Sequence, residues 1–513
     1  MYRGRSRASD GPKGIAVAGA DDYFALQAQL QPEARAAQDL TTGESWSYRA
    51  FDRAASQFAG LLRNHGVGKG ARVVALARNR AELILLHLGC ARIGAIYVPL
   101  NWRLSAVEIA ALVEDAQPSL IIGDALLAQA QLDGLSLGDF VARARHEQPL
   151  PRQSTDHDAP SLILYTSGTS GRPKGALLSE RNIWQTALNF SLFGRVTHES
   201  AVLCDSPMFH IIGLITNVRP ALMRGGRFVV SDGFLPGRTL ERLADPILGI
   251  THYFCVPQMA ATLRADPAFD ASKLRRLTAI FSGGAPHAAD AIRSWTRDGI
   301  PMADGFGMSE AGTVSCMPLD IALIESHAGS AGLIPPELQV RILDEDGDPC
   351  TTGEAGELFI RGANLTSGYW RRPDDTQAAF DQDGWFRTGD IARFDKDGFL
   401  WLVDRKKDMF ISGGENVYPA EIEGALAAYP NLAECAVVGV PDERWGEVGH
   451  LVLVPTPTTN LDFSDVIAYL EPRLARYKIP KHLSVMDQLP RNGAGKLMKA
   501  VLREMLNSAQ SRV

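Results

Sequence analysis

Hydrophobic and polar residues form alternating blocks along the first 300 positions. Apolar residues at 51, 54, 55, 58, 61 and 62 recur at helical spacing, and Gly66 is placed to end that helix. Beyond it, short apolar runs separate longer helical segments. We expect strands at 72–77, 95–100, 119–124, 228–230, 253–256 and 278–282, and helices at 81–94 and 105–116. Such alternation predicts parallel sheets covered by helices.

The pattern changes near residue 338 to short apolar runs with Asp-Gly turns, which predicts a small β-rich subdomain at 338–349, 356–362 and 398–404. A smaller unit follows the charged run "DRKKD". It has a helix from Pro419, strands around 436–440 and 451–454, and a helix near 465–474. We therefore expect an α/β N-terminal domain over 1–404, a hinge at 405–408, and a small, mobile α+β C-terminal domain over 409–513.

Composition supports a folded protein with more than one core. The chain has 513 residues, 45% hydrophobic and 22% charged, which is ordinary for globular proteins but long for a single core. Its net charge of -7 includes no basic excess, so we expect no nucleic-acid partner. Six cysteines lie far apart without a C-x-x-C pair, which disfavours disulfides and zinc and favours a reducing, cytoplasmic location.

Two segments bear on targeting. Residues 1–14 are basic but lack the apolar run of a secretion signal, so we interpret them as a loose tail. The most apolar region, 81–100, contains His87 and Arg92 and is divided at Gly94. We interpret it as a buried helix followed by a strand, with no membrane span.

The stretch "YTSGTSGRPKG", residues 165–175, is too rich in glycine and hydroxyls for a packed element. Apolar "SLILY" precedes it and "SERNI" follows, so we expect a strand, a loop and a helix start. Backbone N–H groups and hydroxyls of such a loop can bind phosphate, and Lys174 adds positive charge. The spacing does not fit G-x-x-x-x-G-K-[ST]. Taken alone, the composition is equally typical of a mobile surface turn.

Four companion motifs decide between these interpretations. They are "SGGAP", "DGFGMSEAG", "GWFRTGDIARFDKDGFLWLVDRKKDMFISGGENVYPAE" and "PRNGAGK". With the loop, and in this order, they resemble the adenylate-forming enzymes, which include acyl- and aryl-CoA synthetases, peptide-synthetase adenylation domains and firefly luciferase. The resemblance covers about 162–496, most of the chain. It implies an acid–CoA ligase that first makes an acyl-adenylate from ATP and then a thioester with CoA.

The resemblance also implies a nucleotide site. The loop would hold the β- and γ-phosphates, Gly283, Gly284 and Ala285 would line the adenine, and Phe306 would stack on it where most relatives carry tyrosine. Glu310 would bind Mg²⁺, with Thr166 as a second ligand, and Asp390 and Arg405 would reach the ribose. The expected ATP- and AMP-binding residues are Thr166, Ser167, Gly168, Thr169, Ser170, Gly171, Lys174, Gly283, Gly284, Ala285, Asp304, Gly305, Phe306, Gly307, Met308, Ser309, Asp390, Arg405 and Lys496.

For catalysis, the resemblance implies that Lys496 bridges the substrate carboxylate and the α-phosphate, where an ammonium neutralises developing charge. The small domain would rotate at Lys407 between the two half-reactions and bring Gly413 and Gly414 beside the pantetheine tunnel. Glu310 and His210 complete the expected catalytic set.

The segment "MFHIIGLITN" corresponds to the family's acyl-pocket motif. We expect Phe209, His210 as gate, Ile212, Gly213, Val256, Ala311 and Gly312 to form the pocket. The segments "MFHIIGLITN", "CVPQM" and "AGTVS" that would form the pocket contain no lysine to pair with a second carboxylate. No aspartate lies near His210 to hold an α-amine, so we expect an apolar fatty or aromatic monocarboxylate and not an amino acid. Arg219 lies just outside these segments and is a candidate partner for a second carboxylate, so a dicarboxylate such as malonate stays an alternative substrate.

Three further alternatives stay open at this point. One is an acyl-AMP ligase that loads a separate carrier protein, because no carrier serine motif follows Lys496. Another is a non-catalytic nucleotide-binding scaffold on the same fold. A homodimer is also left open.

Overall fold

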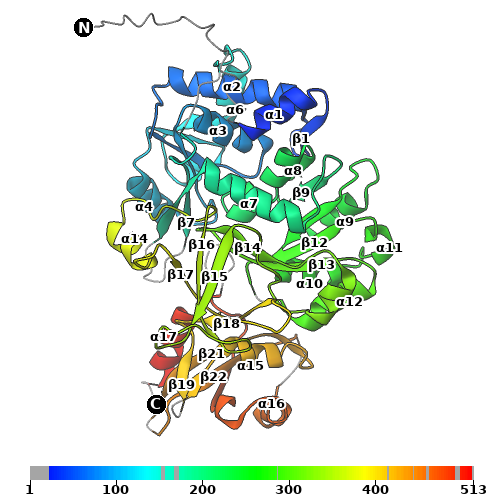
Figure 1. Cartoon of the computed structure of the whole chain (residues 1–513), viewed down its shortest axis with the longest axis vertical. Coiled ribbons are helices and arrows are strands. Elements are labelled where there is room, and N and C mark those ends of the chain that lie inside the picture. Colours follow the sequence, from blue (N-terminus) through cyan, green and yellow to red (C-terminus); the bar gives the residue numbers. More distant parts are fainter. Residues whose placement is uncertain are drawn as a thin grey trace, which may run out of the picture.

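We describe a computed structural model of the chain over residues 22–151, 156–166, 173–285, 287–412, 415–442, 444–457, 461–491 and 497–510. Two large sheets and their helices form the upper part of the molecule, a four-stranded sheet lies below them, and the C-terminal unit lies at the bottom (Figure 1). The predicted class, a large α/β part with a β-rich subdomain and a small C-terminal domain, is confirmed.

The first large sheet has the strand order β6-β5-β3-β4-β7-β8. Its strands are β3 (Arg72–Leu76), β4 (Ile96–Pro99), β5 (Leu120–Gly123), β6 (Leu135–Ser136), β7 (Pro160–Thr166) and β8 (Lys174–Ser179). All neighbours are parallel except β7 and β8. Its helices are α4 (Ala106–Ala116), α5 (Leu126–Gln129) and α6 (Leu137–Ala144). The sheet thus ends in an antiparallel hairpin.

The second large sheet has the order β14-β13-β12-β11-β9-β10-β1-β2. Its strands are β1 (Arg35–Asp39), β2 (Ser45–Ser47), β9 (Ala201–Cys204), β10 (Arg227–Val230), β11 (His252–Cys255), β12 (Ala279–Gly283), β13 (Met302–Met308) and β14 (Gly312–Cys316). The helices on this side are α9 (Pro236–Ala244), α10 (Pro257–Ala265), α11 (Ala271–Leu274), α12 (Ala289–Arg297) and α13 (Ile321–Ser326).

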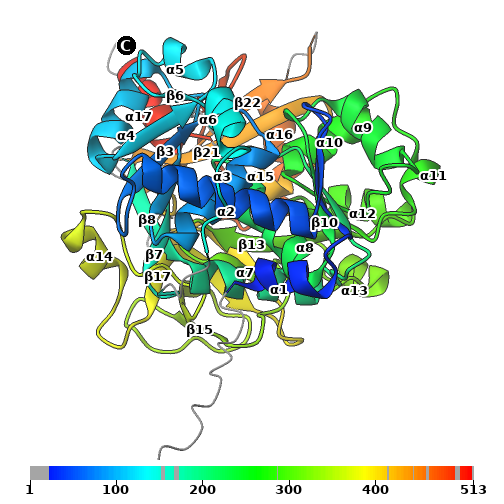
Figure 2. The ribbon, with the colours of Figure 1, turned by 90° about the horizontal axis from the view of Figure 1, so that it is seen from above.

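Helices α2 (Tyr48–Asn64) and α3 (Ala81–Arg92) share one buried core with both sheets, which includes Phe51, Ile84, Val73 and Phe228. In the view from above, α2 lies across the molecule between the α4–α5 side and the green α9–α12 side (Figure 2). Around them lie α1 (Tyr23–Leu30), α7 (Glu180–Phe193), the π-helix η1 (Ile212–Thr216) and α8 (Arg219–Arg224). The core therefore joins the two sheets into one body.

The lower sheet is antiparallel, in the order β15-β16-β17-β18. Its strands are β15 (Leu338–Leu343), β16 (Gly356–Gly362), β17 (Phe386–Phe394) and β18 (Leu400–Arg405), with α14 (Pro373–Ala379) beside them. The C-terminal unit contains β19 (Phe410–Ser412), β20 (Glu415–Val417), α15 (Pro419–Ala425), β21 (Leu432–Asp442), β22 (Gly446–Pro455), α16 (Phe463–Leu470), η2 (Arg476–Lys478), β23 (His482–Val485) and α17 (Lys499–Gln510).

Two sequence-based expectations need comment. The apolar region 81–100 is α3 followed by β4, as predicted, and none of the described helices combines the length and apolar character needed to cross a bilayer. The expected strand, loop and helix start around 165–180 is wrong, because β8 stands between the loop and α7. The run "KGALLS" pairs antiparallel with β7 along its whole length, so the loop joins two strands.

Candidate active site

The base of the glycine-rich loop is fixed by the β7–β8 hairpin. Thr166, the last residue of β7, pairs with Lys174, the first residue of β8. The Thr166 hydroxyl donates to the Lys174 carbonyl at 3.3 Å. The other predicted loop residues, Ser167, Gly168, Thr169, Ser170 and Gly171, lie outside the described residues. The hairpin therefore holds Thr166 and Lys174 side by side where the loop begins and ends.

Lys174 is oriented by α14 and by an aromatic ring. Its Nζ lies 2.5 Å from Asp375 Oδ1 and 5.4 Å from the centroid of the Tyr369 ring. The side chain is 19% exposed. An ammonium group that is partly buried and held by a carboxylate and a ring face is suited to meet a phosphate.

Glu310, the predicted magnesium ligand, is buried beside Tyr369. The Tyr369 hydroxyl donates to Glu310 Oε1 at 3.0 Å, and the Thr366 N–H donates to the Glu310 carbonyl at 2.6 Å. Burial and the adjacent Glu310 charge raise the pKa of Tyr369, so the phenol keeps its proton and donates. Tyr369 therefore links Glu310 to Lys174.

Tyr369 was missed in the sequence because it lies in an irregular segment, 368–372. That segment is bound to β8: the Leu177 N–H donates to the Gly368 carbonyl, and the Trp370 N–H donates to the Gly175 carbonyl. The available signal was the run "GYWRRPDD", in which large aromatic and charged residues crowd a loop where packing alone does not require them.

One carboxylate on α4 ties this segment to the hairpin. Asp115 accepts from the Tyr165 hydroxyl at 2.7 Å, pairs with Arg372 at 2.7 Å, and its carbonyl accepts from the Trp370 ring N–H at 3.0 Å. The three contacts lock the residues on either side of Tyr369, which explains how a loop residue can hold a defined position.

The predicted adenine residues lie where β12, β13 and β14 meet. Gly283 pairs with Gly305, and a Cβ on either residue would lie 3.0 Å from a backbone carbonyl oxygen. Gly284 follows with φ +86, a conformation that favours glycine. Ala285 comes next, and on β13 Gly307 and Met308 pair with β14, at Thr313 and Gly312. The small residues thus allow close backbone packing at this edge.

Asp304 and Phe306 stand on the same strand, β13. Burial raises the pKa of the Asp304 carboxyl well above its usual range, which favours the protonated form. Phe306 is buried in a cluster with Leu338, Leu358 and Leu400 of the lower sheet. The roles expected for these residues and for Ser309 stay predictions.

Asp390 and Arg405, the predicted ribose residues, are brought together. They are directly paired residues of β17 and β18, and Arg405 Nε lies 2.7 Å from Asp390 Oδ1. Asp390 is buried, whereas the Arg405 side chain is 34% exposed. The predicted hinge residue, Lys407, is exposed in the turn after β18, where the Asp408 and Met409 N–H groups donate to the Arg405 carbonyl.

The predicted acyl residues join the adenine side at one point. A Cβ on Gly284 would lie 3.7 Å from Ile212 Cδ1 and 3.9 Å from Val256 Cγ1. Phe209 and His210 precede η1 with ring centroids 4.4 Å apart. The last two predicted acyl residues contact α7. The Ala311 carbonyl accepts from the Thr186 hydroxyl, and a Cβ on Gly312 would collide with the Thr186 side chain.

Burial and, to a smaller extent, the positive charge of Arg103 lower the pKa of His210 to about 4. The gate candidate is therefore neutral near pH 7. Gly213, the next glycine, has no room for a side chain, because a Cβ there would lie 2.2 Å from the Pro207 carbonyl oxygen.

An aromatic residue that the sequence did not reveal lies beside this segment. Trp102 is edge-on to Phe209 with centroids 6.1 Å apart, and the guanidinium groups of Arg78 and Arg103 lie over the Trp102 ring, each 5.1 Å from its centroid. The available signal was the run "NWRL", which places a tryptophan and an arginine between the predicted strand at 95–100 and the predicted helix at 105–116.

Arg219, which kept a second substrate carboxylate open, is engaged inside the protein. Its NH1 lies 3.6 Å from Glu180 Oε2 and its NH2 lies 3.1 Å from His87 Nδ1. With 10% of its side chain exposed, Arg219 already has an internal carboxylate partner.

The C-terminal residues that matter most, Lys496, Gly413 and Gly414, lie outside the described residues. Their neighbours are placed: Arg491 bridges Leu497 on either side of the lysine loop, and Ser412 and Glu415 pair on either side of the glycines. On the main-body side, Asp404 of β18 accepts from the Ala420 N–H at 2.7 Å, so α15 contacts the lower sheet directly.

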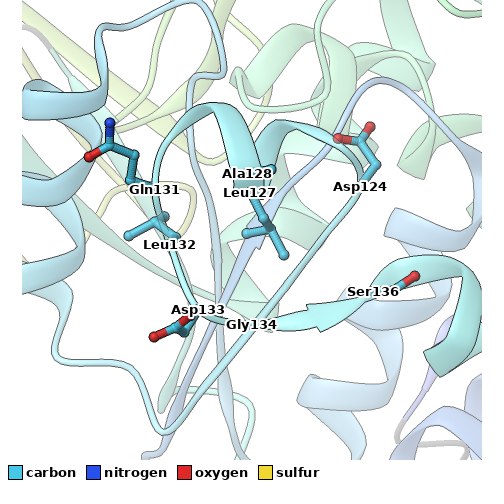
Figure 3. A pocket seen from close by; sticks show the side chains of 8 residues that line it. All are labelled: Asp124, Leu127, Ala128, Gln131, Leu132, Asp133, Gly134 and Ser136. Atoms are coloured by element: carbon cyan, nitrogen blue, oxygen red, sulfur yellow. The ribbon is translucent and has the colours of Figure 1, made fainter.

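A surface hollow lies at the β6 edge of the first large sheet (Figure 3). It is lined by Asp124, Leu127, Ala128, Gln131, Leu132, Asp133, Gly134 and Ser136. These residues lie between the end of β5 and β6, on α5 and its flanking loops, at the sheet edge opposite the β7–β8 hairpin. Asp124 accepts from the Arg78 and Leu126 N–H groups, so its carboxylate shapes a turn. The hollow shares no residue with the candidate site.

Comparison with known proteins agrees with the geometry. Residues 24–370 match the family model "AMP-binding enzyme", and residues 421–496 match "AMP-binding enzyme C-terminal domain". The chain is 36% identical over 484 residues to a feruloyl-CoA synthase of an Amycolatopsis species, with 93% of this chain and 97% of the relative covered. It is 33% identical over 501 residues to a long-chain-fatty-acid–CoA ligase of Mycobacterium tuberculosis, covering 94% and 97%.

Solved structures show the same likeness. ATP-bound MatB from Rhodopseudomonas palustris superposes with a TM-score of 0.87 at 30% identity, covering 94% of this chain and 98% of that one. The o-succinylbenzoate coenzyme A synthetase of Bacillus subtilis in complex with ATP and magnesium ion gives 0.83 at 28%, covering 94% and 99%.

The chain therefore belongs to the AMP-binding enzyme family, as its motifs predicted. It is an AMP-forming acid–CoA ligase, which activates a carboxylic acid as an acyl-adenylate.

Proposed function

We propose that this ligase activates an apolar monocarboxylic acid, fatty or aromatic, and transfers the acyl group to CoA. The observation that carries the proposal is the meeting of Ile212, Val256 and Gly284, which sets an apolar wall against the adenine-side strand ends. The position of Arg219 supports it, because its side chain is only 10% exposed and lies against Glu180 and His87 inside the protein, away from a second substrate carboxylate.

On the nucleotide side, the oxygen donors fit a hard dication. The buried Glu310 carboxylate and the Thr166 hydroxyl would hold Mg²⁺, which when bound neutralises charge on the phosphates. Lys174 would meet the outer phosphates, and Asp390 with Arg405 would bind the ribose hydroxyls. These residues orient ATP so that its α-phosphorus faces the acid.

Lys496 would stabilise the charge that develops as the carboxylate attacks the α-phosphorus and pyrophosphate leaves. The thioester step needs that space for the thiol, so the small domain would rotate. Lys407 suits a hinge because it is exposed in a turn. Rotation would present Gly413 and Gly414 to the main body.

One observation favours a second candidate, an acid with a distal anionic group. Arg103 lies within electrostatic reach of His210 and forms no ion pair with any carboxylate in the part of the chain described here. An anionic tail that passes His210 would meet this guanidinium. We rank this second because Arg103 is exposed, and its guanidinium group already lies over the Trp102 ring.

An acid panel in ATP–pyrophosphate exchange tests both candidates. We expect exchange with ferulate, phenylacetate or medium-chain fatty acids, and at least tenfold weaker exchange with malonate and succinylbenzoate. The reverse ranking would replace the first candidate with the second. If no acid supports exchange, the proposed function is wrong.

A further inference from the structure

Glu180 lies at the junction of the nucleotide side and the acyl side. It is the first residue of α7 and directly follows Ser179, the last residue of β8. Ser179 and Asn182 form a capping box, which fixes where α7 begins. The residue that closes the phosphate-loop hairpin is therefore adjacent to a carboxylate of defined position.

That carboxylate contacts three other elements. Ser161 of β7 donates its hydroxyl to Oε1 at 2.9 Å, His87 Nε2 of α3 lies 3.4 Å from Oε1, and Arg219 NH1 of α8 lies 3.6 Å from Oε2. The Glu180 side chain is 23% exposed, whereas His87 is fully buried. One carboxylate thus joins both strands of the hairpin to α3 and α8.

His87 completes the cluster as a neutral bridge. Burial lowers the pKa of His87, and the positive charge of Arg219 lowers it further. Arg219 NH2 lies 3.1 Å from Nδ1 and 3.5 Å from Nε2, and Nε2 lies 3.4 Å from Glu180 Oε1, so a neutral ring with its proton on Nε2 fits both neighbours. The cluster therefore contains one cation (Arg219), one anion (Glu180) and one neutral ring (His87).

Arg219 is connected to the acyl gate through a short rigid path. It begins α8, and only Asn217 and Val218 separate it from η1. The Leu214 N–H donates to the His210 carbonyl, and the Asn217 N–H donates to the Ile212 carbonyl. Both η1 and α8 pack against α7, so a shift of Arg219 would be transmitted to His210.

We infer that Glu180 is a positioning residue that fixes the phosphate hairpin and the acyl gate in one register, through Ser161 on one side and Arg219 with His87 on the other. The inference rests on the proposed function, because it takes Lys174 and His210 as contacts of the two substrates. If the Glu180 carboxylate served only to stabilise the fold, its removal would lower stability and leave substrate binding unchanged. If it positions the site, its removal weakens the binding of ATP and of the acid together.

The test uses Glu180→Gln in the full-length enzyme, which keeps shape and the acceptor for Ser161 but removes the charge. We expect the KM of the acid, and the dissociation constant of the Mg²⁺ complex of α,β-methylene-ATP, each to rise about fivefold or more. Arg219→Met should raise the acid KM similarly, because it removes the cation that contacts both Glu180 and His87.

The matched control is Asp298→Asn, which removes a partly exposed ion pair with Arg264 (2.8 Å) between helices α10 and α12 and should leave both constants unchanged. If Glu180→Gln does not fold, Ser161→Ala removes a hydrogen bond to the same carboxylate and should raise both constants about twofold.

A lowered melting temperature with both constants unchanged, or a change in only one of them, would overturn the inference. Failure of the wild type to exchange with any acid would instead overturn the proposed function, so the two failures are distinguishable.

Discussion

The Tyr369 hydroxyl donates a hydrogen bond to the buried Glu310 carboxylate at 3.0 Å. The two residues are far apart in the chain, and the contact aims a carboxylate that we propose to bind Mg²⁺. An orienting donor of this kind is a common companion of metal ligands.

Tyr369→Phe should therefore weaken magnesium binding. Loss of a hydrogen bond to a charged group costs about 1.5–3 kcal/mol, so we expect the Mg²⁺ concentration for half-maximal pyrophosphate exchange to rise about tenfold. Magnesium titrations of exchange measure this. Tyr469→Phe, on α16 in the small domain, is the matched control. An unchanged magnesium requirement would show that Tyr369 does not orient the ligand.

Lys496→Ala should separate the two half-reactions. Exchange should fall by at least about a hundredfold, because the ammonium would stabilise charge in adenylation only. Thioester formation from supplied acyl-AMP and CoA should stay within about threefold of wild type. Lys499→Ala, which removes the nearby ion pair with Glu423, is the control. Equal losses in both assays would contradict this division.

Asp390→Asn should raise the KM for ATP about tenfold, since the change removes a carboxylate acceptor and the partner of Arg405. Initial rates at varied ATP give the value, with the acid saturating. The control is Asp397→Asn, an exposed carboxylate in the β17–β18 turn. If the acid KM moved in place of the ATP KM, the ribose assignment would be wrong.

The low pKa of His210, about 4, makes folding stability depend on pH. The unfolded imidazole takes up a proton near pH 6.5, whereas the folded one stays neutral until about pH 4, so its contribution to stability is present above pH 6.5 and is lost as the pH falls towards 4. Urea unfolding of wild type and His210→Gln between pH 4.5 and 7.5 isolates this contribution. Parallel curves for the two proteins would refute it.

Substitution by alanine should change the stability in opposite directions at two glycines, Gly213 and Gly424. At Gly213 a Cβ would lie 2.2 Å from a backbone oxygen, so Gly213→Ala should destabilise by about 1–3 kcal/mol and impair exchange. At Gly424, within α15, nothing lies within 4 Å, so Gly424→Ala should stabilise by about 0.5–1 kcal/mol. Thermal unfolding compares them, and a tolerated Gly213→Ala would show that η1 can shift without cost.

Much of the fold could be predicted because local pattern and tertiary role agree. The strands and helices between 72 and 123 have continuous apolar runs or helical periodicity, as buried parallel strands and their covering helices require. β8 was missed because six residues between a glycine-rich loop and a helix cap carry little periodic signal. β17 was also missed: Gly389, at φ +70, interrupts its alternation.

Some contacts of the candidate site could likewise be predicted from the sequence, and others could not. Asp390 and Arg405 could be expected to lie together from motifs that each stand on one strand, and the two residues do pair. The partners Tyr369 and Trp102 could not, because they depend on which loops pack together. The cluster of Glu180, Arg219 and His87 combines three helices, and no spacing along the chain encodes such a contact.

The ion pair between Lys174 and Asp375 has a consequence for ligand choice. An anion that enters must outcompete a tethered carboxylate whose effective concentration is high. A single phosphate, with one contact to offer, is poorly equipped for this exchange, whereas a triphosphate bound elsewhere along its length can make it. If Lys174 meets the outer phosphates as we propose, its pairing with Asp375 favours a long polyanion over a small ion at this lysine.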